Sequence, residues 1–215
     1  MKFLETPRLL VRHFAPEDAE ALFRVHSNPK VAQHMGDGKP LPYERCIKWI
    51  ETSIHNYQTK GFGASAVIEK STHEFIGCCG LVYDPERSEP EIPEVIYSFE
   101  PCYWGQGFAS EIVPAMLNYG LKQYGLQRIL ATIAPENLAS QRVVEKAGMV
   151  FDREEIESSR GCIPRRSAAK LGDCNPNLAF GSKTFSIPRP LAAGSVDSDG
   201  LPSLFYFIEA NSTER

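Results

Sequence analysis

The stretch Tyr103–Glu111, with the sequence YWGQGFASE, organises the rest of the chain. It places Gly105 and Gly107 two residues apart, adds the small Ala109, and runs directly into a helical pattern. Glycine adopts positive φ and lets a ligand approach the backbone closely, because it has no Cβ. A glycine-rich turn before a helix points several unpaired N–H groups and the positive end of the helix dipole at one spot. The stretch therefore predicts an anion-binding turn suited to a phosphate, although an ordinary strand-to-helix turn can carry the same glycines.

Two common phosphate-binding motifs do not occur in the sequence. Without a GxxxxGK[ST] motif, the chain lacks the lysine and hydroxyl pair that hold a nucleoside triphosphate and its metal. The glycine spacing is not GxGxxG either, and no acidic residue nearby is placed to bind a ribose. The turn therefore suits a diphosphate that is held and not cleaved, with no metal site.

Composition narrows the class of protein. The chain has 215 residues, of which 42% are hydrophobic and 23% charged, as in a soluble globular protein with a full core. The net charge of −4 and the absence of a basic run argue against nucleic-acid binding, and no apolar stretch approaches the roughly 18 residues of a membrane span. The N-terminus has no signal-peptide core, and the six cysteines form no CxxC pair. We expect a cytoplasmic protein with free thiols that binds neither nucleic acid nor membrane.

Hydrophobic periodicity predicts the order of the structural elements. Short apolar runs bounded by turn residues indicate strands, and apolar residues that recur about every 3.6 positions indicate helices. The expected strands are Leu9–Phe14, Ala64–Glu69, Phe75–Val82, Val95–Phe99, Arg128–Ile133 and Ser203–Glu209, and the expected helices follow Pro16, Tyr43, Gly107 and Asn137. Pro114 lies inside the third of these helices, where a proline deletes a hydrogen bond, so a bend is expected there.

The C-terminal part of the chain differs from the rest. Residues 158–202 are rich in Gly, Pro, Ser and Ala and show no sustained periodicity, whereas SLFYFIE at Ser203–Glu209 reads as a buried strand. We expect a core over residues 1–157, an irregular and mobile insertion over 158–202, and a terminal strand over 203–209 that completes the same domain.

Two stretches of this sequence together resemble the Gcn5-related N-acetyltransferase (GNAT) superfamily. The pyrophosphate loop of that family reads [RQ]xxGx[GA], and WGQGFA at Trp104–Ala109 is similar to it. The second family motif has an asparagine and a small residue before a short helix that ends EKxGF. Here it is matched by Asn137, Ser140 and EKAG at Glu145–Gly148, with Met149 for the aromatic residue. Within the superfamily, the opening ETPRLLVRHF resembles the branch typified by the ribosomal-protein N-terminal acetyltransferases.

The resemblance, which covers about Glu5 to Asp152, implies a fold and a cofactor. The fold is α/β (α+β), with a mixed, strongly twisted sheet of six to seven strands flanked by helices. The donor is acetyl-CoA, whose pantetheine arm would pair with the edge of the strand Val95–Phe99. Main-chain N–H groups of the glycine turn would hold its pyrophosphate, and the second motif would contact the rest of the arm. The implied cofactor-binding residues are Gln106, Gly107, Phe108, Ala109, Ser110, Asn137 and Ser140.

Transfer from a thioester needs a neutral amine and a proton for the leaving thiolate. An alkyl amine with a pKa of about 10 is mostly charged at neutral pH, so a base or a water relay must remove a proton. Glu94 matches a position where many relatives have an acidic residue, and the alternative is a surface glutamate in an acidic loop. Relatives often provide a tyrosine as the acid on the second-motif helix. This chain has Val144 at that place, so Ser140 or a water is expected to protonate the thiolate.

The sequence therefore predicts an acetyl-CoA-dependent N-acetyltransferase that moves the acetyl group directly to a primary amine. The acceptor is either a protein N-terminus or a small molecule, and the protein is a monomer or a homodimer. A catalytically silent acyl-CoA-binding sensor is the alternative from another class, because the tyrosine is missing.

Overall fold

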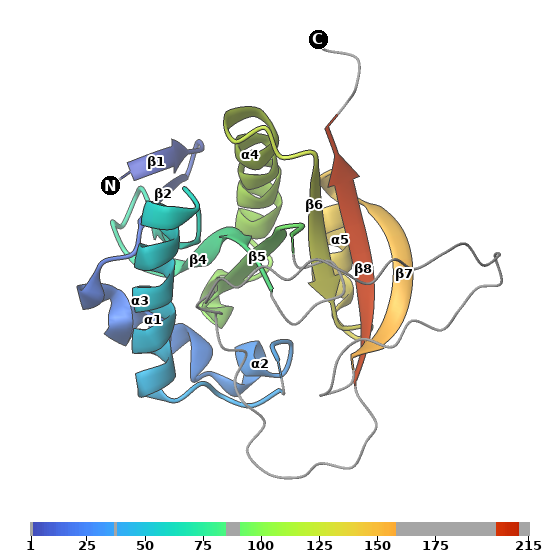
Figure 1. The fold of residues 1–215 in the computed structure, drawn as a ribbon. Helices are drawn as coiled ribbons and strands as arrows, with labels where there is room; N and C mark the ends of the chain where they lie inside the picture. The colour runs from blue at the N-terminus through green and yellow to red at the C-terminus, as the bar shows by residue number, and fades with distance from the viewer. Residues whose placement is uncertain (1, 37, 85–90, 158–200, 211–215) are drawn as a thin grey trace, which may run out of the picture.

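The computed structural model describes residues 2–36, 38–84, 91–157 and 201–210, which form an eight-stranded sheet with helices on both faces (Figure 1). The strands are β1 (Lys2–Glu5), β2 (Leu9–His13), β3 (Ala64–Glu69), β4 (Phe75–Val82), β5 (Glu94–Phe99), β6 (Arg128–Ile133), β7 (Val150–Glu157) and β8 (Leu201–Glu209). The helices are α1 (Ala19–His26), α2 (Pro29–Ala32), α3 (Tyr43–Thr59), α4 (Phe108–Gln123) and α5 (Leu138–Lys146), with short 3-10 turns η1 (Pro16–Asp18) and η2 (Pro101–Tyr103).

The strand order is β1-β2-β3-β4-β5-β6-β8-β7, and β5 and β6 form the one parallel pair among the described strands. The predicted mixed α/β sheet is confirmed. Its eight strands exceed the expected six to seven, because β1 and β7 were not predicted. Both lie at the edges of the sheet, where sequences such as KFLE and VFDREEIE show little of the apolar alternation of a half-buried strand.

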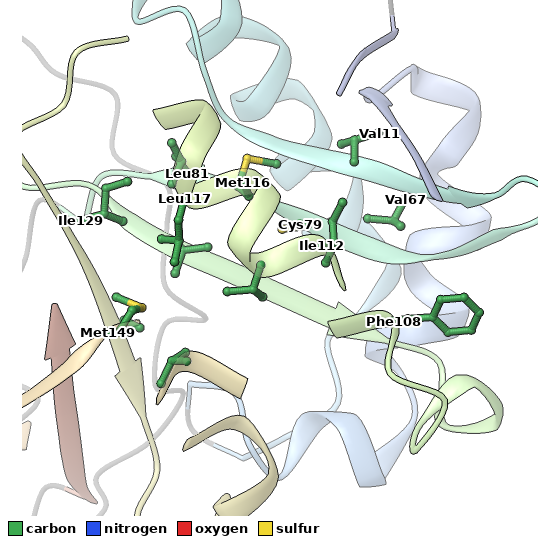
Figure 2. Close-up of a cluster of buried hydrophobic side chains, with 14 of the residues drawn as sticks. Val11, Val67, Cys79, Leu81, Phe108, Ile112, Met116, Leu117, Ile129 and Met149 are labelled. Atoms are coloured by element: carbon green, nitrogen blue, oxygen red, sulfur yellow. The ribbon is translucent and has the colours of Figure 1, made fainter. Parts of the chain in front are cut away.

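Two hydrophobic clusters lie on opposite faces of the sheet. Helices α1 and α3 pack on one face and α4 and α5 on the other. Figure 2 shows part of the second cluster, to which α4 contributes Ile112, Met116 and Leu117 and in which α4 lies over β4 and β5. β4 is buried along its whole length, as expected for a strand covered by helices on both sides. The continuous helix α4 extends through Pro114, so the proline does not end it.

β8 belongs to the same sheet and lies between β6 and β7. It begins at Leu201, two residues earlier than predicted, and residues 158–200 of the expected insertion lie outside the described residues. The division into core, insertion and terminal strand remains a prediction. Within the described ranges, each helix is too short or too polar to cross a bilayer.

Candidate active site

The parallel strands β5 and β6 diverge in Figure 1, and the interval between their backbones beyond the paired end is referred to as the gap. Their single register pair is Glu94–Leu130, and the Leu130 amide donates to the Pro93 carbonyl at 2.9 Å. In a regular parallel ladder the next amide of β6, that of Thr132, would donate to the Val95 carbonyl. This amide donates instead to Oε1 of Glu94, at 2.9 Å. The two strands therefore stop pairing at this point.

The strand edge that borders the gap carries main-chain groups that could bind a ligand. Alternate residues of a strand point their carbonyl and amide groups to the same side. The Pro93 carbonyl faces β6, so the Val95 carbonyl and the main-chain groups of Tyr97 also face the gap. The Phe99 carbonyl accepts a bond from the Trp104 indole at 2.8 Å. The arrangement fits the expectation that this edge pairs with an extended amide-containing arm.

The predicted glycine turn lies beyond the C-terminal end of β5. Gly105 and Gly107 have φ of 74° and 81°, and Gly107 is the N-cap of α4. An added Cβ would meet no atom within 4 Å at Gly105, and at Gly107 its nearest neighbour would be Arg8 Nη2 at 3.6 Å. The backbone conformation, and not crowding, therefore requires glycine at both positions. The space beside them is open to a ligand.

Main-chain donors surround this space. The main-chain bond from the Glu111 amide to the Gly107 carbonyl, at 3.1 Å, closes the first turn of α4. The amides of Phe108, Ala109 and Ser110 precede it and have no acceptor within the helix. These residues fit a bound diphosphate, because three amides and the positive end of a sixteen-residue helix converge there.

Arg8, for which the sequence predicts no role, contacts both the glycine turn and the first turn of α4. Its Nη1 donates to the Gln106 carbonyl at 2.9 Å, and its Nε donates to Oε2 of Glu111 at 2.6 Å. The guanidinium also lies 4.3 Å from the centre of the Phe108 ring. Burial opposes ionisation of Glu111, but bonds from Thr6 and Arg8 outweigh it and lower its pKa. The start of β2 is thereby fixed to the first turn of α4.

We predict that Arg8→Met weakens CoA binding about tenfold, because a charge-assisted bond of roughly 1.5–3 kcal/mol supports the turn. Calorimetric titration with CoA measures the change. Arg12→Met is the matched control, since Arg12 lies four residues further along the chain, in β2, and pairs with Asp18, at 2.7 Å, away from the turn. The control should lower the melting temperature and leave the Kd unchanged. Equal Kd values for Arg8→Met and the wild type would show that Arg8 does not support the turn.

The second motif lies where β6 leads into α5. Asn137 is the N-cap of α5, and its side chain accepts a bond from the Ser140 amide at 3.1 Å. The Tyr97 hydroxyl donates to the Ser140 carbonyl at 3.3 Å and so links β5 to α5. Burial raises the pKa of Tyr97 to about 12, which keeps the hydroxyl protonated. Val144, on the same helix as Ser140, is fully buried in the core.

Glu94 lies at the closed end of the gap, on the sheet face covered by α1 and α3. Its side chain shares a face with Ile96, which packs in that cluster, whereas Val95 and Phe99 point to the α4 side. Glu94 is only 9% exposed. The alternative that it is a surface glutamate of the preceding loop is therefore wrong.

A buried histidine lies on the same face. Ser98 Oγ is 2.9 Å from Nε2 of His26, whose Nδ1 is 3.0 Å from the Leu22 carbonyl. A carbonyl only accepts, so Nδ1 carries the proton and Ser98 donates to Nε2. Burial lowers the pKa of His26 to about 4, so the ring is neutral near pH 7. No local sequence signal predicts this pair, because 72 residues separate its members.

The structure brings the predicted site residues to the borders of one gap. The glycine turn lies at its open end, Asn137 and Ser140 lie at the start of the helix that follows β6, and Glu94 lies at its closed end. A turn suited to a diphosphate, a strand edge without a β-sheet partner and a carboxylate, in this order, suit an enzyme that holds a CoA thioester and transfers its acyl group. The fold and the site thus define a CoA-dependent acyltransferase class.

Comparison with known proteins identifies the family. The chain belongs to the acetyltransferase (GNAT) domain family, whose model matches residues 8–150. It is 33% identical over 153 residues to the uncharacterized N-acetyltransferase YoaA of Bacillus subtilis (strain 168), which covers 71% of this chain and 84% of the relative. The expected membership of the GNAT superfamily is confirmed, and the chain is an N-acetyltransferase.

Solved structures share the fold. The acetyltransferase (GNAT family) from Bacillus anthracis superposes with a TM-score of 0.65 at 24% identity, over 98% of this chain and 99% of the other. RimL, a ribosomal L7/L12 alpha-N-protein acetyltransferase solved in complex with coenzyme A, has a TM-score of 0.65 at 14% identity, over 97% and 98% of the two chains.

Proposed function

We propose that this protein transfers the acetyl group of acetyl-CoA directly to a primary amine inside the gap between β5 and β6. The observation that carries the proposal is the early end of strand pairing at Glu94–Leu130, directly before a strand edge that leads to the glycine turn. Such a gap offers main-chain groups along its length and a cradle for an anion at its end. Bound acetyl-CoA would supply the activated thioester.

The residues around the gap have separate tasks in this proposal. Main-chain amides over residues 106–110 bind the pyrophosphate, with Gly107 at the centre of the turn. The Val95 carbonyl and the Tyr97 amide pair with the pantetheine amides. Asn137 caps α5 and, with Ser140, lines the opposite side of the arm. All these contacts orient the thioester and exclude water from it.

Proton transfer falls to two groups in this proposal. Glu94 takes a proton from the acceptor amine, since it lies at the closed end of the gap on the face opposite α4. The Thr132 amide donates to Oε1 of this carboxylate, which fixes the position of the side chain. Ser140, or a water beside it, returns a proton to the leaving thiolate. The Tyr97 hydroxyl adds a second protonated donor next to Ser140.

We predict that Glu94→Gln lowers kcat/KM about 100-fold while the affinity for CoA stays nearly unchanged. Glutamine keeps the size of the side chain and an oxygen that can accept from Thr132, but it cannot take a proton. The acidic limb of the pH–rate profile should also flatten. Steady-state kinetics across pH measures kcat/KM, and calorimetric titration measures the affinity for CoA. Near-normal rates at every pH would remove Glu94 from the proton path and leave a water chain in its place.

The acceptor is a protein N-terminus or a small-molecule amine, and the fold favours neither. Membership of the N-acetyltransferase family disfavours the alternative of a silent acyl-CoA sensor, although Val144 stands where relatives often have a tyrosine. Release of free thiol from acetyl-CoA in the presence of amines separates the two, because a sensor binds the thioester without turnover.

A further inference from the structure

We propose that the Glu94 side chain opens the cofactor gap, by taking the Thr132 amide that would otherwise extend the pairing of β5 with β6. This positioning role rests on the proposed function only in assigning CoA to the gap. It is separate from any role of the carboxylate as a base.

The outer edges of both strands are fully paired, so only the inner edges are in question. β5 pairs with β4 from Val82–Glu94 to Gly77–Phe99, and β6 pairs with β8 along its whole length. Each strand therefore turns one row of unpaired amides and carbonyls toward the other. Two such rows are complementary and close together at Glu94–Leu130, so continued pairing is the default result.

The Thr132 amide is the first group at which pairing fails. A buried amide without an acceptor costs roughly 1–3 kcal/mol, so Thr132 requires a partner. Oε1 of Glu94 provides it at 2.9 Å, in place of the Val95 carbonyl. The Thr132 hydroxyl does not take part, because Oγ1 is buried and has no hydrogen-bond partner.

The bond from the Thr132 amide to Glu94 affects the main-chain groups that are proposed to bind the pantetheine arm. If Thr132 donated to the Val95 carbonyl, the next bond of the ladder would join the Tyr97 amide to the Thr132 carbonyl. Both β5 groups would then be occupied by β6. By holding the Thr132 amide, Glu94 keeps the Val95 carbonyl and the Tyr97 amide available to a ligand.

Three variants test this inference by calorimetric titration with CoA and by thermal melting. Glu94→Met keeps the length of the side chain without a comparable acceptor, and we expect CoA affinity to fall at least tenfold. Glu94→Gln retains an acceptor oxygen and should bind CoA as the wild type does. Thr132→Val removes only the hydroxyl and should also bind normally, because the main-chain amide remains.

Several results would overturn the inference. Wild-type CoA affinity in Glu94→Met would do so, as would an equal loss in Glu94→Gln, which would implicate the charge and not the acceptor. If Glu94→Met does not fold, NMR spectroscopy of the Thr132 amide in the unliganded wild type tests whether this amide donates to Glu94. A through-hydrogen-bond coupling should join the Thr132 amide nitrogen to the carboxylate carbon of the Glu94 side chain, whereas a coupling to the Val95 carbonyl carbon would refute the bond. A fully active Glu94→Gln variant would contradict the role of Glu94 as a base and leave this inference intact. A wild type that binds no CoA would contradict the proposed function.

Discussion

Gly107→Glu is expected to abolish CoA binding while the protein stays folded. Gly107 has φ of 81°, a conformation that costs a side chain about 1–2 kcal/mol, against a typical folding stability of roughly 5–15 kcal/mol. The new carboxylate would lie beside the amides of Phe108, Ala109 and Ser110, where the account places a diphosphate. It would occupy the space and repel the anion. Calorimetric titration with CoA measures the loss, and circular dichroism checks the fold.

Two controls separate charge at the site from backbone strain. Gly107→Ala brings the same strained φ without the charge and should lose only part of the affinity. Gly125→Glu adds a carboxylate to another position with positive φ, 62°, where a Cβ would meet no atom within 4 Å. Gly125 follows the opposite end of α4, so its variant should bind CoA normally. Undiminished affinity in a folded Gly107→Glu protein would remove the diphosphate from this turn.

Ending the chain at residue 200 is expected to produce the largest loss of stability. β8 lies between β6 and β7, so its removal strips β6 of a partner and leaves β7 without any. Phe205 is fully buried and Tyr206 nearly so. Truncation of one buried phenylalanine costs about 3–5 kcal/mol, a large share of a typical stability of roughly 5–15 kcal/mol.

Thermal melting measures the effect of this truncation. A chain that ends at Ala210 is the control, because it retains all of β8 and the main-chain bond from the Ala210 amide to the Gln127 carbonyl. We expect the control to melt as the full chain does and the shorter chain to show no cooperative transition. An unchanged melting temperature in the shorter chain would mean that β8 does not support the sheet.

The elements that the sequence predicts well are those whose signal is local. β3, β4 and β6 match their predicted bounds, because each is an apolar run that ends at turn residues. β7 has no such local signal, because it is polar: its Asp152 forms ion pairs with Arg153 and with Arg128 of β6. Such a strand is fixed by its pairing with β8, which comes from a distant part of the chain.

The candidate site also contains some residues whose contacts are local in the sequence and others whose contacts are with distant parts of the chain. The glycine turn and the Asn137 cap depend on neighbours within a few residues, so their spacing in the sequence predicts them. Arg8 reaches a turn 98 residues away, and the Tyr97 hydroxyl meets Ser140 across 43 residues. The bond from the Thr132 amide to Glu94 also spans 38 residues. Only the assembled sheet brings these groups together.

A direct assay of acetyl transfer tests whether the protein moves the acetyl group of acetyl-CoA to a primary amine. The purified full chain is incubated with acetyl-CoA and a panel of primary amines that includes peptides with free N-termini and small-molecule amines, and both free thiol and acetylated product are measured. The account predicts equimolar thiol and acetylated amine with at least one acceptor, at a rate that Gly107→Glu abolishes. A wild type that binds CoA yet releases no thiol above the amine-free rate with any acceptor would contradict the account and identify a sensor.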